Sequence, residues 1–404
     1  MNTLPEPTMP SAMAQLLSLL SNDALSGSAD MSAWSADVWE GIIELAARQG
    51  VSPLLYHRLS NASLPEPVLS RLRRHYLRTA ADNTLRFAAM EEALLAMQKA
   101  DVSVILLKGA HLAPLVYGNI ALRPMVDLDL LVAEGDLQTA LEVLAHLGYA
   151  PVASEAWMNV GHGHYSLRRD GHLVELHQRV GAFLVGAHID QDSLWERATR
   201  TTVGASPARV LNPGDLLLHT CVHSASHHLL QLGLMPLCDV RQILVHYGGQ
   251  IVPQEIVARA KEWRVARALF LMLSLSHTLL GAPVDRALLE ALAPPDAQEH
   301  LRLGMQILLN EATQDSPPST NVTALWGEPS WRARLGVLGR VLVPTTERMR
   351  SLYGVPAGRP VRPWLYLRRW VDVVIHRGRS MRQAVGRPNE DIDWRAFVRW
   401  LAEG

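Results

Sequence analysis

Residues 102–132, VSVILLKGAHLAPLVYGNIALRPMVDLDLLV, contain the pattern that decides the fold. The first six are mostly apolar and β-branched, which is typical of a buried strand ending at a Lys-Gly turn. HLAPLVYG, residues 111–118, favours a short helix that ends at its glycine. Residues 126–132 alternate and then run apolar, which predicts a second strand, and residues 135–147 predict an amphipathic helix. We therefore expect a small α/β unit from residue 101 onward.

A β-hairpin follows this unit. HYSLRR and HLVELHQRV are joined by Asp-Gly at 170–171, and this dipeptide between two alternating runs is a strong two-residue hairpin signal. The turn sets the register, so Ser166 pairs with Glu175 and His164 with His177. Paired residues share a face. These four side chains thus form one polar cluster, and the opposite face is apolar: Tyr165, Leu167, Val174 and Leu176.

The second strand carries two acids on one face. Side chains of a strand alternate, so Asp127 and Asp129 point the same way, while Val126, Leu128 and Leu130 point into a core. Two carboxylates about 7 Å apart along a strand can bind a hard cation. The alternative is one structural salt bridge and one solvated aspartate.

The flanks of this core are helical. Alanine, leucine and arginine dominate the first hundred residues, and apolar residues recur at helical spacing there and again from 212 onward. We predict an α+β protein, with a small mixed-sheet core between helical regions. Its expected parts are an N-terminal helical region, the core, a helical domain and an Arg/Trp-rich, mostly helical tail: 1–100, 101–205, 206–312 and 313–404.

Composition excludes several classes of protein. The 404 residues carry 38 basic and 39 acidic side chains, which gives no whole-chain reason to expect a nucleic-acid or anionic-membrane partner. Two cysteines, Cys221 and Cys238, cannot build a disulfide framework. No signal peptide is evident, and no apolar run reaches the roughly 18–20 residues of a membrane span. A soluble cytoplasmic protein is the expectation.

Three motifs in order resemble a known family. They are Lys108-Gly109 after the first strand, Val-Asp-Leu-Asp-Leu at 126–130 and Val-Glu-Leu at 174–176. With the helical stretch LLLHTCVHSASHHLL…LCDVRQIL, they resemble the uncharacterised bacterial nucleotidyltransferases of the polymerase-β-like superfamily, over roughly 100–250. One departure is Gly109-Ala110, where the superfamily often has Gly-Ser or Gly-Gly, so this turn offers no hydroxyl to a phosphate.

The resemblance implies metal-dependent transfer of NMP from an NTP to an acceptor, with release of pyrophosphate. Asp127, Asp129 and Glu175 would be the catalytic residues and would hold Mg²⁺ or Mn²⁺. The implied nucleotide-binding residues are Lys108, Gly109, Arg123, His164 and His177. The acceptor (small molecule, peptide, sugar or RNA end) stays open. A non-catalytic nucleotide-binding or scaffolding protein on the same fold is the alternative.

Several of these residues have a structural alternative. Arg123 either bridges phosphate oxygens or neutralises the aspartate pair in a salt bridge. His164 and His177 either act as a base or supporting partner, or simply pack across the hairpin. Asp239 matches an aspartate of the family, and bracing between the helices and the core is its favoured role.

Histidines recur every four residues near position 220. His219, His223 and His227 line one helix face, a spacing that can bind zinc or present donors to a ligand. The family carries a histidine in this stretch, and His223 matches it best, as an accessory site residue. A structural or solvated role for each is favoured, because the usual supporting cysteine or carboxylate ligands are missing.

The tail is basic and aromatic. Residues 331–400 carry 15 arginines, no lysine and 5 acidic residues, a formal charge of +10, together with Trp331, Trp364, Trp370, Trp394 and Trp400. Interleaved arginine and tryptophan suit single-stranded nucleic acid or a membrane surface. The simpler interpretation, which we favour, is a helical tail whose tryptophans pack inward and whose arginines offset the acidic remainder of the chain.

We expect Asp127→Asn or Asp129→Asn to abolish transfer and to leave the metal-free fold intact or more stable. Either change removes a charge from a crowded carboxylate cluster.

Overall fold

The computed structural model describes most of the chain: residues 11–21, 31, 34–152, 164–181, 187–310, 326–327, 331–343, 346–353, 355, 359–371 and 392–403. The sequence Gly161-His162-Gly163-His164 suggests a flexible stretch, and its first three residues lie outside the described ones, whereas His164 begins a strand. The linker expected at 313–321 also lies outside the described residues.

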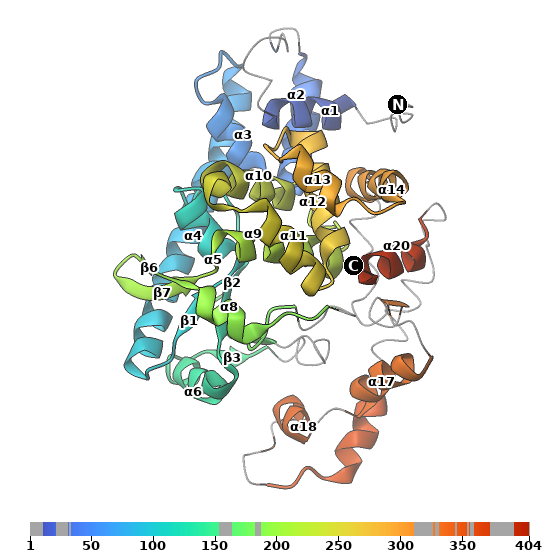
Figure 1. The fold of residues 1–404 in the computed structure, drawn as a ribbon. Coiled ribbons are helices and arrows are strands. Elements are labelled where there is room, and N and C mark those ends of the chain that lie inside the picture. Colours follow the sequence, from blue (N-terminus) through green and yellow to red (C-terminus); the bar gives the residue numbers. More distant parts are fainter. Residues whose placement is uncertain are drawn as a thin grey trace.

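A seven-stranded mixed sheet forms the centre of the core, with the order β3-β4-β5-β2-β1-β7-β6. β1 pairs in parallel with β7, and β2 with β5, while the other neighbours are antiparallel. The sheet and the surrounding helices confirm the predicted α+β class (Figure 1). The strands are β1 (Val104–Leu106), β2 (Asp127–Val132), β3 (Ala150–Pro151), β4 (His164–Arg169), β5 (His172–His177), β6 (Thr199–Val203) and β7 (Ser206–Val210).

One face of the sheet is buried against two helices. α4 (Glu66–Lys99) and α6 (Leu137–His146) cover the apolar residues of β2 and β5, which are fully buried: Leu128, Leu130, Val174 and Leu176. The expectation that Val126 joins this core is wrong, because its side chain is 75% exposed. The strand begins one residue later, at Asp127, so the alternation of faces does not extend to Val126.

The hairpin of β4 and β5 has the predicted register. Asp170 and Gly171 have φ of 48° and 84°, the left-handed pair that a tight two-residue turn requires. Ser166 lies opposite Glu175, and His164 opposite His177. The β6–β7 hairpin was not predicted. It extends the sheet to Val210, beyond the predicted core boundary at 205.

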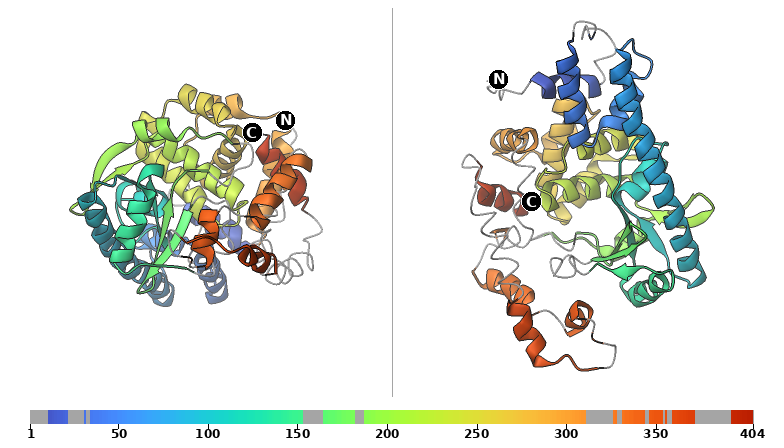
Figure 2. Two further views of the ribbon diagram at one scale, coloured as in Figure 1. Left: turned by 90° about the horizontal axis from the view of Figure 1, so that it is seen from below. Right: turned by 180° about the vertical axis from the view of Figure 1, so that it is seen from behind.

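Helices precede, connect and follow the strands. α4 runs along the sheet and reaches the helices at the other end of the molecule (Figure 2). The remaining helices are α1 (Ser11–Leu20), α2 (Ala36–Arg48), α3 (Ser52–Leu59), α5 (Lys108–His111), η3 (Leu112–Val116), η4 (Glu134–Asp136), α8 (Gln191–Arg197), α9 (Pro213–Val222), η5 (His223–His227), α10 (Met235–Tyr247), η6 (Gly248–Gln250), α11 (Pro253–Glu262), α12 (Ala266–Leu280), α13 (Arg286–Leu292), α14 (Ala297–Leu309), α17 (Trp331–Leu342), α18 (Thr346–Tyr353) and α20 (Trp394–Ala402).

The helix that faces the sheet begins as its sequence predicts. Asn212 caps α9 by accepting from the backbone N–H of Asp215, and proline occupies the first helical position. Asp215 is buried and ion-paired with Arg197 at 2.9 Å and with Arg259 at 3.0 Å. These contacts fix α9 against α8 and α11, and so hold its histidines in place.

The tryptophans of the tail divide into two groups. Trp400 of α20 is 3% exposed and stacks on His300 at 4.2 Å between ring centroids. Trp331, Trp364 and Trp370 are at least half exposed. The expectation of inward packing therefore holds for Trp400 and for Trp394, which is partly buried against the core, and fails for these three. Among the described residues, no helix combines the length and hydrophobicity that a transmembrane span needs.

Candidate functional site

The parallel pairing of β2 with β5 brings the predicted acids together. Asp129 lies directly opposite Glu175 in the ladder, and Leu131 opposite His177. Asp127 and Asp129 project from the face of the sheet opposite to α4 and α6, toward the helices that follow the sheet. One donor atom from each of Asp129, Glu175 and His177 lies within 4.8 Å of the other two. The predicted proximity of Glu175 to this strand is confirmed for Asp129.

Lys108 lies between two of these carboxylates. Its Nζ is 2.6 Å from Asp129 Oδ1 and 3.8 Å from Glu175 Oε2. The backbone of Lys108 has a φ of 44°, in the left-handed region that a non-glycine residue rarely adopts. The turn from β1 into α5 therefore directs the ammonium back over the strand ends. α5 begins at Lys108 itself, three residues earlier than the sequence predicted.

The two aspartates differ in their electrostatic surroundings. Burial raises the pKa of Asp129, but the Lys108 charge and the His177 hydrogen bond outweigh it and hold that pKa well below its usual range. Burial and the neighbouring Asp129 charge raise the pKa of Asp127 to about 6. Asp129 is thus a firmly ionised, paired carboxylate, whereas Asp127 carries a charge that the protein alone compensates poorly.

Both histidines of the hairpin border the same cluster. His177 Nε2 is 2.8 Å from Asp129 Oδ1, and His164 Nε2 is 3.9 Å from Glu175 Oε1. The centroids of the two imidazole rings lie 5.0 Å apart. Burial lowers the pKa of His177 despite the hydrogen bond to Asp129. The neutral ring therefore donates its Nε2 proton to Asp129 and fixes the orientation of that carboxylate.

Arg123 is held by Asp239. Its Nε and Nη2 reach the Asp239 carboxylate at 3.0 and 2.9 Å, and the Tyr117 hydroxyl donates to the same carboxylate at 2.9 Å. Arg123 therefore forms its ion pair with Asp239 of α10, and not with the aspartate pair of β2. This contact joins the loop before β2 to the helical domain.

Gly109 packs closely beneath that arginine. A Cβ at this position would lie 2.6 Å from Arg123 Nη1 and would overlap the Met125 side chain. A glycine at the turn therefore permits Arg123 and Met125 to close over it. The sequence identified Gly109 as a phosphate-turn residue but gave no indication of this contact.

Three supporting residues were missed. Asn83 of α4 is fully buried and donates to the carbonyls of Ile120 and Arg123, which fixes the loop before β2. A lone asparagine inside a long amphipathic helix was the available signal. Tyr117, which binds Asp239, and His111 of α5 had no distinguishing pattern.

A divalent cation fits this donor set. Asp127, Asp129 and Glu175 contribute three carboxylates. Among the residues that the structure describes, Lys108 is the cation paired with Asp129 and Glu175, and Arg123 is neutralised by Asp239. A formal charge of −2 remains when all three acids are ionised. Carboxylate oxygens are the ligands that Mg²⁺ and Mn²⁺ prefer. Asp129, Glu175 and His177 offer the donor atoms that lie close enough together to hold such an ion, and Asp127 lies on the same face outside this group.

Two buried histidines near this site remain neutral. His111 is 0% exposed, and neither ring nitrogen has a hydrogen-bond partner among the described residues. Burial lowers the pKa of His111 to about 3 and that of His219 to about 3. Each group binds its proton more weakly in the folded than in the unfolded chain, where the pKa is about 6.5.

We predict that acid weakens the fold through these histidines. The folded-state pKa is depressed, so stability is complete above pH 6.5 and falls as the pH drops from about 6.5 toward 3, by up to about 1.4 kcal/mol per pH unit for each histidine. His111→Leu should raise stability at pH 7 and reduce the loss between pH 7 and pH 5. Urea unfolding at both values measures this, with exposed His146→Gln as the control. If the pH dependence of stability were unchanged in His111→Leu, the buried His111 would not be a cause of the acid sensitivity.

The structure brings together the Lys-Gly turn, the Asp-x-Asp strand and the third acid on a neighbouring parallel strand, the three motifs on which the resemblance to nucleotidyltransferases rests. Comparison with known families agrees. The chain belongs to a family of uncharacterised nucleotidyltransferases, whose model matches residues 35–281. This match covers the core and the helices through α12. No curated protein and no solved structure matches the chain.

Proposed function

We propose that the protein is a Mg²⁺-dependent enzyme that transfers NMP from an NTP to an acceptor hydroxyl or phosphate and releases pyrophosphate. One observation carries the proposal: Glu175 lies beside Asp129 across the β2–β5 ladder, with Asp127 on the same face. Three acids on one face at a strand end, only partly compensated by positive charge, are costly to the fold, and divalent-cation binding would offset that cost.

The residues of the chain have separate tasks in this scheme. His177 keeps Asp129 ionised and oriented, and Lys108 offsets the charge of Asp129. When bound, the metal would stabilise phosphate charge and lower the pKa of the acceptor hydroxyl. The acceptor oxygen, having lost its proton to solvent, would attack the α-phosphorus. The bond between the α-phosphorus and the oxygen that bridges to the β-phosphate would break, and pyrophosphate would leave.

Lys108 is suited to move between partners. Its Nζ is only 3.8 Å from Glu175 while bound to Asp129, and a triphosphate presents a stronger anion in the same space. We infer that Lys108 exchanges a carboxylate for a phosphate oxygen when NTP binds. Backbone N–H groups of the Gly109-Ala110 turn would supply the remaining phosphate contacts.

The direct test uses the purified protein with each α-³²P-labelled NTP, Mg²⁺ and fractions of cell extract. We expect label to enter one class of acceptor and to depend on added Mg²⁺ or Mn²⁺. Glu175→Gln should reduce incorporation by about 1,000-fold or more, as expected for loss of a group that stabilises transition-state charge. Glu134→Gln, an exposed acid just beyond β2, is the matched control and should retain activity.

A binding measurement separates catalysis from mere nucleotide binding. Mn²⁺ binding followed by electron paramagnetic resonance should weaken in Glu175→Gln and stay unchanged in Glu134→Gln. Metal-dependent NTP binding without incorporation into any fraction would favour the non-catalytic alternative. Absence of metal binding in the unaltered protein would remove the basis of the proposal.

A further inference from the structure

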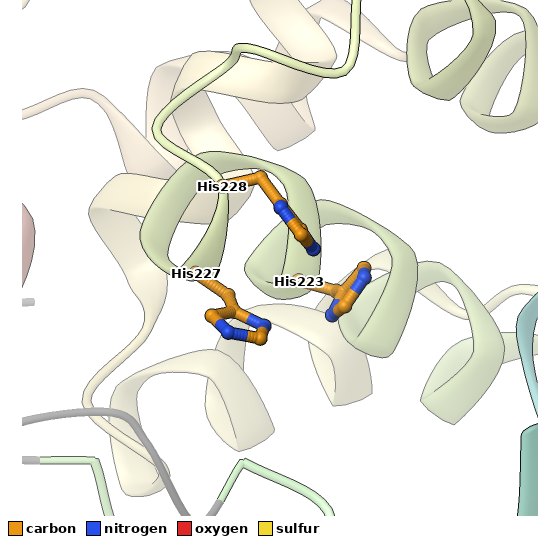
Figure 3. A group of neighbouring side chains, drawn as sticks. All are labelled: His223, His227 and His228. Atoms are coloured by element: carbon orange, nitrogen blue, oxygen red, sulfur yellow. The ribbon is translucent and has the colours of Figure 1, made fainter. Parts of the chain in front are cut away.

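A second group of metal-binding side chains lies outside the carboxylate site. His223, His227 and His228 come together at the end of α9, and one ring nitrogen of each lies within 4.8 Å of the other two. Figure 3 shows the three rings converging from one turn of the chain. The centroids of the His227 and His228 rings are 4.4 Å apart, and those of His223 and His228 are 4.6 Å apart.

A change of helix type produces this convergence. In an α-helix, positions i and i+4 share a face, but position i+5 lies about 140° away. Here α9 passes into the π-helix η5, and the backbone N–H of His228 donates to the carbonyl of His223 at 3.2 Å. The wider turn therefore brings the i, i+4 and i+5 side chains to one side. Such π-helical turns occur frequently at functional sites.

The backbone immediately after the cluster is strained. Leu229 and Leu230 both have positive φ, 48° and 65°, which is uncommon for residues other than glycine. Leu230 N–H donates to the Ser224 carbonyl at 2.9 Å and closes the turn. Both leucines are buried, so packing holds them in this conformation. The fold thus maintains a costly backbone geometry at the position that aligns His228 with its neighbours.

The histidines that converge differ from the predicted set of His219, His223 and His227, because His228 takes the place of His219. His219 stacks on His223, with ring centroids 5.8 Å apart and an interplanar angle of 29°, and does not join the converging nitrogens. The converging nitrogens therefore belong to His223, His227 and His228.

We propose that His223, His227 and His228 form a binding site for one Zn²⁺ ion. Imidazole nitrogen is a preferred zinc ligand, and three histidines with an open fourth position are a known zinc arrangement. Tetrahedral zinc at Zn–N distances of 2.0–2.1 Å needs nitrogens about 3.3 Å apart, which rotation of the two less buried rings, His227 and His228, can reach. The fourth position is left to water or a ligand.

The zinc site adjoins the carboxylate site without sharing residues with it. His219, which stacks on His223, lies on α9, the helix that faces the sheet and continues into η5. α20 packs against η5 from the C-terminal side. The ion would therefore lie where the helical domain, the nucleotide site and the end of the chain meet.

The test uses the full chain without a histidine tag, stripped of metal and held in excess Mg²⁺ so that the carboxylate site is saturated. Zn²⁺ titration against a chromophoric chelator should show one tight equivalent. His227→Gln and His228→Gln should each weaken it by roughly 100-fold, because each removes one of three protein ligands. The exposed His146→Gln should have no effect.

Asp129→Asn separates this site from the proposed catalytic centre and should leave Zn²⁺ affinity unchanged. X-ray absorption of the zinc-loaded unaltered protein provides a measurement that needs no variant, and three imidazole nitrogens in the zinc shell are expected. The proposal is overturned if the unaltered protein binds no tight zinc, if binding survives both histidine changes, or if the shell contains only oxygen. Failure of nucleotidyl transfer alone would leave these results intact.

Discussion

Asp129→Asn should abolish nucleotidyl transfer and also destabilise the protein. Asp129 is 2% exposed and accepts from Lys108 at 2.6 Å and from His177 at 2.8 Å. An amide at this position removes the charge that holds both partners, and it points an N–H₂ group toward one of them. We expect the free energy of unfolding to fall by about 2–4 kcal/mol. This is slightly less than for a fully broken buried ion pair, because Lys108 keeps Glu175 as a second partner.

Asp127→Asn is the matched comparison for this prediction. It should abolish transfer equally, but the metal-free protein should be more stable at pH 7, by about 1 kcal/mol. The pKa of Asp127 is raised to about 6, so its ionised form is disfavoured in the fold. Thermal melts in chelator-containing buffer measure both variants. The structure thus corrects the expectation that both changes spare the fold. Equal destabilisation by the two variants would contradict the conclusion that Asp129 is a paired carboxylate and Asp127 a poorly compensated one.

Asp239→Ala should cause the largest loss of stability among the candidate site residues, about 3–5 kcal/mol. Asp239 is 2% exposed and accepts from Arg123 and Tyr117. Its removal leaves a buried guanidinium with no counter-charge. Urea unfolding measures the loss. Asp215→Ala breaks another buried aspartate-arginine contact, away from the nucleotide turn, and serves as the control.

A double-mutant cycle identifies the cause. Arg123→Ala together with Asp239→Ala should be more stable than Asp239→Ala alone, because the unpaired charge is then absent. Additive losses would show that the two residues do not stabilise each other. NTP affinity, measured on the same variants, should fall less in Asp215→Ala than in Asp239→Ala, since only the latter anchors the arginine that lies over Gly109.

The hairpin and the acidic strand were predictable from the sequence because local interactions determine them. The Asp-Gly turn at 170–171 sets its own register, and two-residue periodicity places Asp127 and Asp129 on one face. The cap at Asn212 is equally local. Each of these features depends on residues a few positions apart, so the chain needs no distant partner to specify it.

Other features were decided by the tertiary structure. Glu175 and Asp129 are 46 positions apart in the sequence but lie side by side in the sheet. Arg123 and Asp239 are 116 positions apart and form an ion pair. The sequence suggested Asp127 and Asp129 as acidic partners of Arg123. The packing of α10 instead places Asp239 beside it. His228 joined its cluster through a π-helical turn that propensity does not reveal. Local periodicity determines which face a side chain occupies, but the choice among distant charges depends on desolvation and packing, which exist only once the chain has folded.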